Sequence, residues 1–168
     1  MKTLRAIRPD DFDPLLRIVN AAAEKYRGQI PADCFHEPYM TAEHLRRDID
    51  AGVTFTVCEL DGVLVGAMGL QRVRDVDLIR HAYVSPAAQG GGIGAALIDD
   101  LKRRSSHRLL VGTWTAATWA IRFYERNGFV LASPARAAEL LARYWSIPAR
   151  QADVSVVLEL VPGGTYGS

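Results

Sequence analysis

The sequence predicts a mixed α+β fold whose central, mostly antiparallel sheet contains one parallel pair of strands and is flanked by helices. Three segments rich in β-branched and aromatic residues, 53–60, 63–73 and 76–84, follow one another with only short turns between them. This order predicts an antiparallel meander. A helical pattern at 93–104 then separates the third segment from the next apolar one, 108–113. A helical crossover of this kind joins parallel strands.

The first fifty residues are expected to form one strand and two helices. The strand spans 3–8, and a helix follows from Pro9 to about Tyr26. Residues 29–40 contain two prolines and no clear hydrophobic period, which indicates a loop. Thr41 is the expected N-cap of the second helix, which runs to Asp50.

The remaining elements follow from turn residues and periodicity. Asp61 and Gly62 give a strong hairpin signal between the first two strands of the meander. After the strand at 108–113 the chain alternates between helices and short strands, expected at 117–127, 129–131, 133–144 and 154–160. Without linkers or repeats, residues 1–160 are expected to form a single domain, with a flexible C-terminal tail at 161–168.

Composition excludes several classes of protein. The 168 residues carry a net charge of +1, so nothing indicates nucleic-acid binding. No apolar run is long enough to span a membrane, and the N-terminus lacks a signal-peptide core. Cys34 and Cys58 form neither a disulfide framework nor a metal motif. We therefore expect a cytoplasmic protein that uses no metal; its oligomeric state is open, a homodimer included.

The most informative stretch for function is the glycine-rich loop between the strand at 76–84 and the helix at 93–104. Four glycines fall within five positions, at 90, 91, 92 and 94. Glycine allows positive φ and a close approach of the backbone to a ligand. A helix that starts directly after such a loop presents free N–H groups, which favour a phosphate or pyrophosphate.

Two common phosphate-binding motifs fit this loop poorly. A P-loop is excluded because no Gly-Lys-Ser/Thr follows the glycines. Residues 90–95 match the letters of a dinucleotide-binding fingerprint, but that motif needs an acidic residue at the end of the next strand. The next strand, 108–113, has none.

The loop instead resembles that of the GNAT superfamily of N-acetyltransferases. Gln89-x-x-Gly92-x-Gly94 is similar to the family's Q/R-x-x-G-x-G/A loop, and Ala82-Tyr83-Val84 before it resembles the end of the family's fourth strand. The run from Thr118 to Phe129 is similar to the family's later helix-to-strand signature. The resemblance covers roughly residues 3–132.

This resemblance implies a fold in which the fourth and fifth strands splay apart to admit the pantetheine arm of coenzyme A. It implies acetyl-CoA as co-substrate and transfer of the acetyl group to a small-molecule or peptide amine, by direct attack in a ternary complex. An acyl-CoA-binding sensor on the same fold, with weak or no catalysis, is the alternative. The cofactor-binding residues implied are Ala82, Tyr83, Val84, Gln89, Gly90, Gly91, Gly92, Ile93, Gly94 and Ala95.

For catalysis the resemblance assigns Tyr124 as the acid or hydrogen-bond donor to the leaving thiolate. Two family features are missing: Gly112 stands where some relatives have a glutamate, and Ala117 where many have an asparagine. The proton acceptor is therefore open. His81 titrates near neutrality, is expected on the same strand face as Asp77, and is the hypothetical base or water relay.

The acceptor pocket is expected to be lined by the loop after the first helix. The candidate side chains there are those of Tyr26, His36, Tyr39 and Met40, which alternatively only cover that helix. An acyl-cysteine route through Cys34 is disfavoured, because the loop shows no histidine and acid arrangement around it beyond His36. The sequence does not identify the amine.

Overall fold

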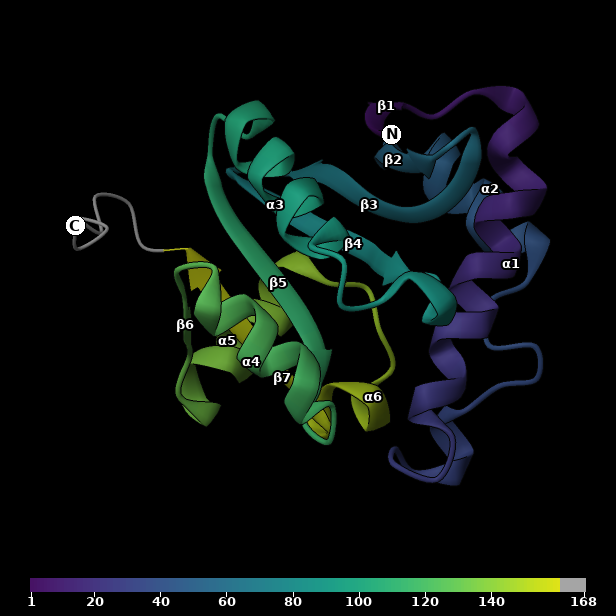
Figure 1. The fold of residues 1–168 in the computed structure, drawn as a ribbon. Helices are drawn as coiled ribbons and strands as arrows, with labels where there is room; N and C mark the ends of the chain where they lie inside the picture. Colours follow the sequence, from purple (N-terminus) through teal and green to yellow (C-terminus); the bar gives the residue numbers. More distant parts are fainter. Residues whose placement is uncertain (161–168) are drawn as a thin grey trace.

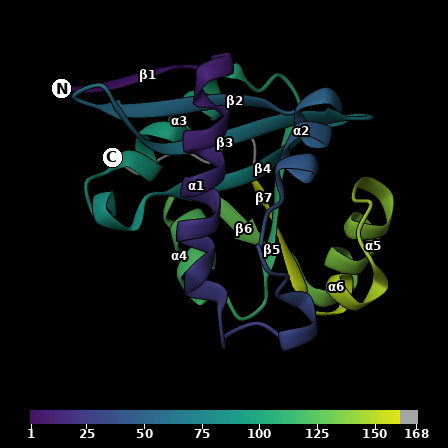
Figure 2. The same ribbon diagram turned by 90° about the vertical axis from the view of Figure 1, so that its right-hand side faces the viewer.

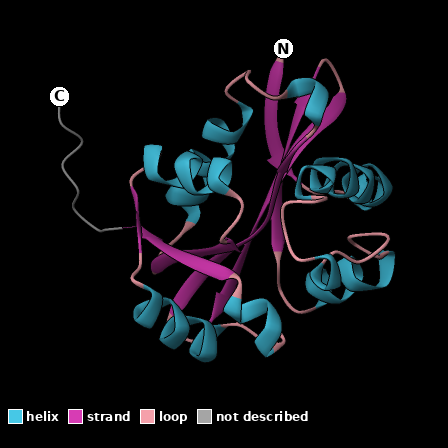
Figure 3. Cartoon of the chain, turned by 90° about the horizontal axis from the view of Figure 1, so that it is seen from below, coloured by secondary structure: helices cyan, strands magenta, loops and turns pink. Residues whose placement is uncertain are grey.

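The structure is a computed structural model that describes residues 1–160, so the expected tail at 161–168 lies outside the described residues. A mixed sheet runs through the molecule with helices packed against both of its faces (Figures 1 and 3). The strands are β1 (Lys2–Ala6), β2 (Thr54–Leu60), β3 (Val63–Val73), β4 (Val76–Val84), β5 (Arg108–Trp114), β6 (Phe129–Leu131) and β7 (Ser155–Leu160).

The helices agree with the predicted pattern, apart from some short elements. The α-helices are α1 (Phe12–Ala23), α2 (Ala42–Asp50), α3 (Ile93–Arg104), α4 (Thr118–Arg126), α5 (Pro134–Tyr144) and α6 (Ala149–Asp153). Single 3-10 turns flank α1, and a further one, Ala32–Cys34, lies in the segment predicted as loop. The sequence analysis did not assign α6, because five residues are too few to show a helical period.

The order of strands in the sheet confirms the predicted fold class. It is β1-β2-β3-β4-β5-β7-β6, and every neighbouring pair is antiparallel except β4 with β5. Figure 2 shows α1 crossing β3 and β4, with α5 and α6 lying to the right of the sheet. The parallel pair therefore lies in the middle of the sheet, where α3 makes the crossover.

Three apolar clusters fix the helices on the sheet. Leu97, Ile98 and Leu101 of α3 and Tyr124 of α4 pack with β-strand residues such as Ile79. On the opposite face, Leu15 and Val19 of α1 pack with Val57 and Ala67, and α5 packs on Leu78 and Leu110. Burial of these side chains dominates the stability of the fold.

The parallel pairing of β4 with β5 is short. It joins residues 76–79 to residues 108–111 and ends at Ile79 and Val111. Both strands continue beyond this point, β4 to Val84 and β5 to Trp114, and Figure 1 shows them diverging. The splay that the family resemblance implied is therefore present, and it leaves one edge of the last residues of β4 without a strand partner.

A β-bulge in β4 lies directly beyond the last parallel pair. Ala67 pairs with Tyr83 and Gly69 pairs with Arg80, so two residues of β4, His81 and Ala82, stand opposite one residue of β3. His81 has a φ of 55°, in the left-handed region. A bulge of this kind bends the strand and re-aims its side chains.

The bulge overturns the expectation that Asp77 and His81 share a face. Asp77 bonds to Ser105 at the end of α3. His81 instead contacts Asp48 of α2 and stacks on Phe55, which belongs to the cluster beneath α1 and α2. Period-two alternation fails here because the bulge inserts one residue into the strand.

We expect Gly69→Ala to destabilise the protein. A Cβ at residue 69 would lie 2.7 Å from the carbonyl oxygen of Arg80 and 2.7 Å from a methyl carbon of Val53. Relieving that overlap shifts the backbone opposite the bulge, which costs about 1–3 kcal/mol. Gly91→Ala is the control, because its nearest contact is 3.6 Å away. Urea unfolding measures both, and equal stability of the two variants would show that the bulge adjusts freely.

Candidate active site

A cavity of about 450 Å³ lies where β4 and β5 diverge. It is lined from both faces of the sheet, by α3 and α4 on one side and by the end of α1 on the other. Its lining residues are Ala22, Lys25, Tyr26, Met68, Ala82, Tyr83, Val84, Ala88, Gln89, Gly90, Gly92, Ile93, Gly94, Ala95, Trp119, Ala120, Phe123, Tyr124, Arg126 and Asn127. Of the predicted cofactor-binding residues, only Gly91 is not among them.

The glycine-rich loop forms the N-terminal end of α3. Gly90 and Gly92 have φ values of 85° and 76°, which side chains other than glycine rarely adopt. Gly92 is the N-cap, and its carbonyl accepts the N–H of Ala96. The N–H groups of residues 93–95 precede this bond, so no carbonyl of the helix can accept them. Together with the helix dipole they make an anion site at the cavity wall.

Close packing holds the loop against α4. A Cβ at Gly94 would lie 3.0 Å from the ring of Phe123, so glycine lets the first turn of α3 approach that ring. The side chain of Asn127 donates to the carbonyl of Phe123, over 2.8 Å, at the end of α4. These contacts place the N-terminus of α3 beside the C-terminal half of α4.

The end of β4 presents backbone groups to the cavity. The N–H of Ser85 donates to the carbonyl of Val65 on β3, over 2.7 Å. Because neighbouring residues of a strand point in opposite directions, the N–H and carbonyl of Val84 point away from β3. The side-chain amide of Gln89 donates to this carbonyl, over 3.3 Å. The N–H of Val84 therefore points to the side of β4 on which β5 no longer pairs with it.

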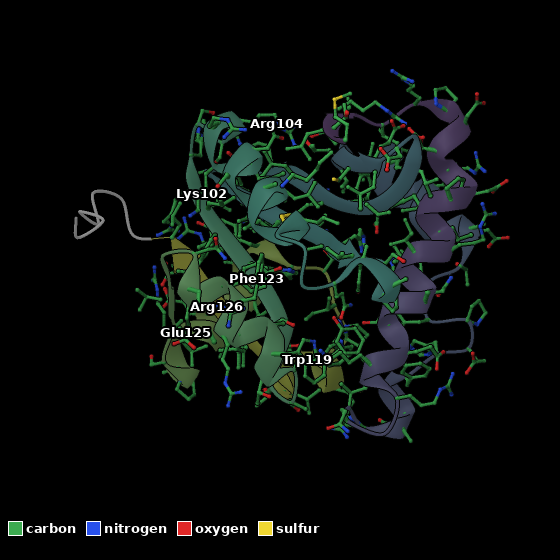
Figure 4. All side chains as sticks on the ribbon, in the orientation of Figure 1. Lys102, Arg104, Trp119, Phe123, Glu125 and Arg126 are labelled. Atoms are coloured by element: carbon green, nitrogen blue, oxygen red, sulfur yellow. The ribbon has the colours of Figure 1, made fainter. Side chains whose placement is uncertain are left out.

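The charges that line the cavity are positive. Lys25 and Arg126 are the lining residues with ionised side chains, and no aspartate or glutamate is among the residues lining it in the described part of the chain. Figure 4 shows Arg126 at one end of α4 and Trp119 at the end nearer α1. A cavity with this balance favours an anionic ligand.

Tyr124 lies in the wall of the cavity. It is 5% exposed, and burial raises the pKa of its hydroxyl, so the hydroxyl keeps its proton at neutral pH. Its ring packs edge-on against Phe123 and Phe129. The hydroxyl is consequently a fixed hydrogen-bond donor.

Tyr26 and Tyr83 line the end of the cavity nearest α1. Burial raises the pKa of Tyr83 well above its usual range, and the neighbouring hydroxyls of Tyr26 and Tyr39 raise it further. The hydroxyl of Tyr39 accepts the indole N–H of Trp114, over 2.9 Å. Of the predicted acceptor residues, Tyr26 lines the cavity and Tyr39 packs behind it, with ring centroids 5.4 Å apart.

The other predicted acceptor residues do not reach the cavity lining. His36 is exposed to solvent, and Met40 is buried in the cluster beneath α1 and α2. The backbone of Met40 both donates to and accepts from the side-chain amide of Asn20, over 2.8 and 3.0 Å. This pair of bonds closes the segment between α1 and α2 at its base.

His81 is also outside the lining of the cavity. Its Nε2 lies 2.5 Å from a carboxylate oxygen of Asp48, and burial lowers the pKa of its imidazole although Asp48 opposes this effect. The neutral ring thus donates to the carboxylate. The hypothesis that His81 accepts a proton from the amine depended on a position close to the thioester, and His81 does not line the cavity.

A family comparison decides between the phosphate-binding alternatives. The model of the acetyltransferase (GNAT) domain matches residues 20–141, well over half of the chain. The chain belongs to the GNAT family. Membership of this family supports an acetyl-CoA-dependent acyltransferase. The glycine-rich loop is therefore part of a GNAT fold and not of a dinucleotide-binding fold.

Individual relatives agree with this assignment. An uncharacterised N-acetyltransferase of Methanocaldococcus jannaschii is 31% identical over 149 residues, which cover 76% of this chain and 60% of that relative. The chain thus spans about 60% of the length of the curated relative it matches.

Solved GNAT structures share the fold at low identity. The ribosomal-protein-S18-alanine N-acetyltransferase of Escherichia coli has a TM-score of 0.67 and 16% identity, with 100% of this chain and 99% of that chain covered. The PaiA N-acetyltransferase of Thermoplasma acidophilum, in complex with coenzyme A, has a TM-score of 0.69 and 16% identity, with 95% and 98% covered. These likenesses show the fold alone.

Gly112 and Ala117, the two positions that depart from the GNAT pattern, both lie in closely packed surroundings. At Gly112 a Cβ would lie 3.3 Å from the indole of Trp145, so the space for a glutamate side chain is already filled. Ala117 is fully buried as the N-cap of α4 and makes no side-chain hydrogen bond. Neither position supplies a proton acceptor.

Sequence reasoning missed the cationic and aromatic part of the lining, namely Lys25, Trp119 and Arg126. Trp119 and Arg126 belong to the run that carried the family resemblance, and their spacing of about two helical turns could have placed them on one face of α4. No local pattern marks Lys25, because the end of α1 reaches the cavity only through tertiary packing.

Other site types find no support in the described residues 1–160. They contain no group of three or more His, Cys, Asp or Glu side chains arranged to hold a metal ion. Among the same residues, no helix has the length and apolar character needed to cross a bilayer.

The pair of His81 and Asp48 gives a prediction for stability in mild acid. Because burial lowers the pKa of His81, the unfolded chain binds the proton more readily, and stability falls as the pH drops below about 6.5. We expect His81→Asn to be less stable than wild type at pH 7.5, and this deficit to shrink by up to about 1 kcal/mol at pH 5.5.

Urea unfolding at the two pH values measures this change, with His36→Gln as the control variant, because His36 is exposed and lies outside the contacts of Asp48. Asparagine tolerates the left-handed φ of residue 81, which makes it the appropriate replacement. A deficit that is constant or grows in acid would mean that His81 is protonated in the folded protein.

Proposed function

We propose that the protein is an N-acetyltransferase that moves an acetyl group from acetyl-CoA to a primary amine by direct attack in a ternary complex. One observation supports this most: a single cavity joins the free N–H groups at the start of α3 to the unpaired edge of β4 and to the hydroxyl of Tyr124. Family membership supports the same activity.

The residues present fit coenzyme A. The backbone N–H groups of 93–95 and the nearby cation Arg126 suit a pyrophosphate, and the edge of β4 beyond Ile79 suits a pantetheine arm that hydrogen-bonds like a strand. Acetyl-CoA supplies the activated thioester. The N–H of Val84 is the donor we assign to the thioester carbonyl oxygen, where negative charge develops during attack.

Tyr124 stabilises the leaving thiolate by donating a hydrogen bond. A thiol has a pKa near 8.5 and tyrosine near 10, and burial raises that of Tyr124 further. Complete transfer of the phenolic proton would therefore be strongly uphill, while a hydrogen bond to the sulfur is favourable. The proton on the thiol then comes from solvent.

The amine must arrive unprotonated, because an ammonium has no lone pair. The lining of the cavity includes neither a histidine nor a carboxylate among the described residues. The hydroxyls of Tyr26 and Tyr83 can accept hydrogen bonds from the amine but keep their own protons, since burial raises both pKa values. Water in the open cavity is the acceptor we assign to the released proton.

The lack of a side-chain base also favours a second candidate, an acyl-CoA sensor with weak or no catalysis. The two functions differ in turnover and agree in cofactor binding. A screen of acetyl-CoA turnover across an amine panel, measured as free thiol, distinguishes them. Release of thiol with at least one amine, well above the rate without amine, supports the enzyme.

We expect Gly92→Val to weaken coenzyme A binding by at least about tenfold. Valine is strained at the φ of 76°, so the loop must leave the conformation that exposes the N–H groups of α3. Gly62→Val is the matched control, with a φ of 81°, open surroundings and a place in the β2–β3 hairpin. Calorimetry measures the affinities, and wild-type affinity in Gly92→Val would place the pyrophosphate elsewhere.

Tyr124→Phe should lower kcat by about 10²-fold while the affinity for acetyl-CoA stays within about threefold of wild type. The hydroxyl acts when the thiolate leaves, so its loss affects the rate and not the binding of the ground state. Tyr144→Phe is the control, a buried tyrosine bonded to Asp75 and outside the cavity lining. Unchanged kcat in Tyr124→Phe would reduce Tyr124 to a packing residue.

A further inference from the structure

We propose that the acceptor is a primary amine that also carries a carboxylate on an apolar or aromatic body, and that Lys25 binds this carboxylate. The proposal rests on the acetyltransferase function above and names the substrate class of the same cavity. Three observations carry it: the partners of Lys25, the ion pairs around it and the aromatic walls beside it.

Lys25 lines the cavity, and its ammonium packs over an aromatic ring. Its ammonium nitrogen is 4.6 Å from the ring centroid of Trp119, and both residues line the cavity. Within residues 1–160 no carboxylate forms an ion pair with Lys25. A carboxylate that enters the cavity therefore finds a positive charge that is not already neutralised.

The neighbouring carboxylates are already bound to arginines. Arg27 bridges Glu24 and Glu37, each over 2.8 Å, and Arg150 holds Asp33 over 3.0 Å. The end of α1 and the segment after it thus offer no unpaired acid to a cationic substrate. Lys25 and Arg126 would repel a polyamine, and the lining formed by the described residues contains no carboxylate that would attract it.

Lys25 lies toward the opposite end of α4 from the expected pyrophosphate site. It sits over Trp119 in the first turn of α4, whereas Arg126 ends that helix beside the glycine-rich loop, as Figure 4 shows for the two α4 residues. Seven residues of helix separate the two α4 positions, or about 10 Å. The two cations therefore bind different groups.

The walls next to Lys25 are aromatic. The rings of Tyr26 and Trp119 stack with centroids 6.0 Å apart and an interplanar angle of 26°. Tyr83, with a buried hydroxyl, completes this end of the cavity. Such walls favour an apolar or aromatic body, and the tyrosine hydroxyls can orient the amine toward the edge of β4.

The test uses phenylalanine and phenethylamine, which differ only by the carboxylate, with spermidine as the polycation. We expect wild type to acetylate phenylalanine with the highest kcat/KM of the three. Lys25→Met, which keeps an unbranched apolar stem but removes the ammonium, should lower kcat/KM for phenylalanine by about tenfold and leave phenethylamine unchanged. Lys25→Arg retains the charge and should restore most of the preference.

The KM for acetyl-CoA should be the same in wild type and Lys25→Met. A rise in that KM would assign Lys25 to the cofactor and overturn the proposal. Equal losses for phenylalanine and phenethylamine would show that Lys25 only packs on Trp119, and a preference for spermidine would contradict the proposed charge. Each of these outcomes leaves the acetyltransferase function intact.

A binding measurement separates the proposal from the activity. N-acetylphenylalanine should bind to the protein saturated with coenzyme A, and Lys25→Met should weaken this binding about tenfold in calorimetry. Binding without turnover of any amine would overturn the acetyltransferase function and keep the carboxylate site. Absence of binding to wild type, together with no preference for phenylalanine, would overturn the site itself.

Discussion

The early end of the pairing between β4 and β5 is the constraint on which the site depends. Only residues 76–79 of β4 pair with β5, after which a bulge bends β4 and the strands separate. The separation removes ladder partners from the backbone of β4 and opens a passage between the two faces of the sheet. Unpaired backbone groups are costly when buried, so this edge is suited to a ligand that completes the ladder.

The two ends of the passage are built from different kinds of structure. At one end, backbone N–H groups and Arg126 form an anion site whose chemistry hardly depends on side chains. At the other end, Lys25, Tyr26 and Trp119 form a site that depends on side chains entirely. The proposed function thus places cofactor binding and amine selection in separate parts of the molecule.

Most of the fold and the glycine-rich end of the cavity were predictable, whereas the end of the cavity beside α1 was not. Hairpin residues, helical periods and the glycine-rich loop are local signals, and the structure follows them. The bulge at His81 has no local signal, and it reverses the face on which the sequence had placed that histidine. Lys25 acquires its position from the packing of α1 against the sheet, which no spacing in the sequence encodes.

The two hydrogen bonds between Asn20 and Met40 have a consequence for how the acceptor preference of this protein can change. Two hydrogen bonds at the base of the segment 20–40 fix its ends, while its interior provides Lys25, Tyr26 and Tyr39. The segment is also tied to β5, because the hydroxyl of Tyr39 accepts the indole N–H of Trp114. Substitutions that keep this contact, such as those at Lys25, need not disturb the sheet. Under the proposed function, acceptor preference can therefore change through substitutions in this segment while the glycine-rich end of the cavity stays the same.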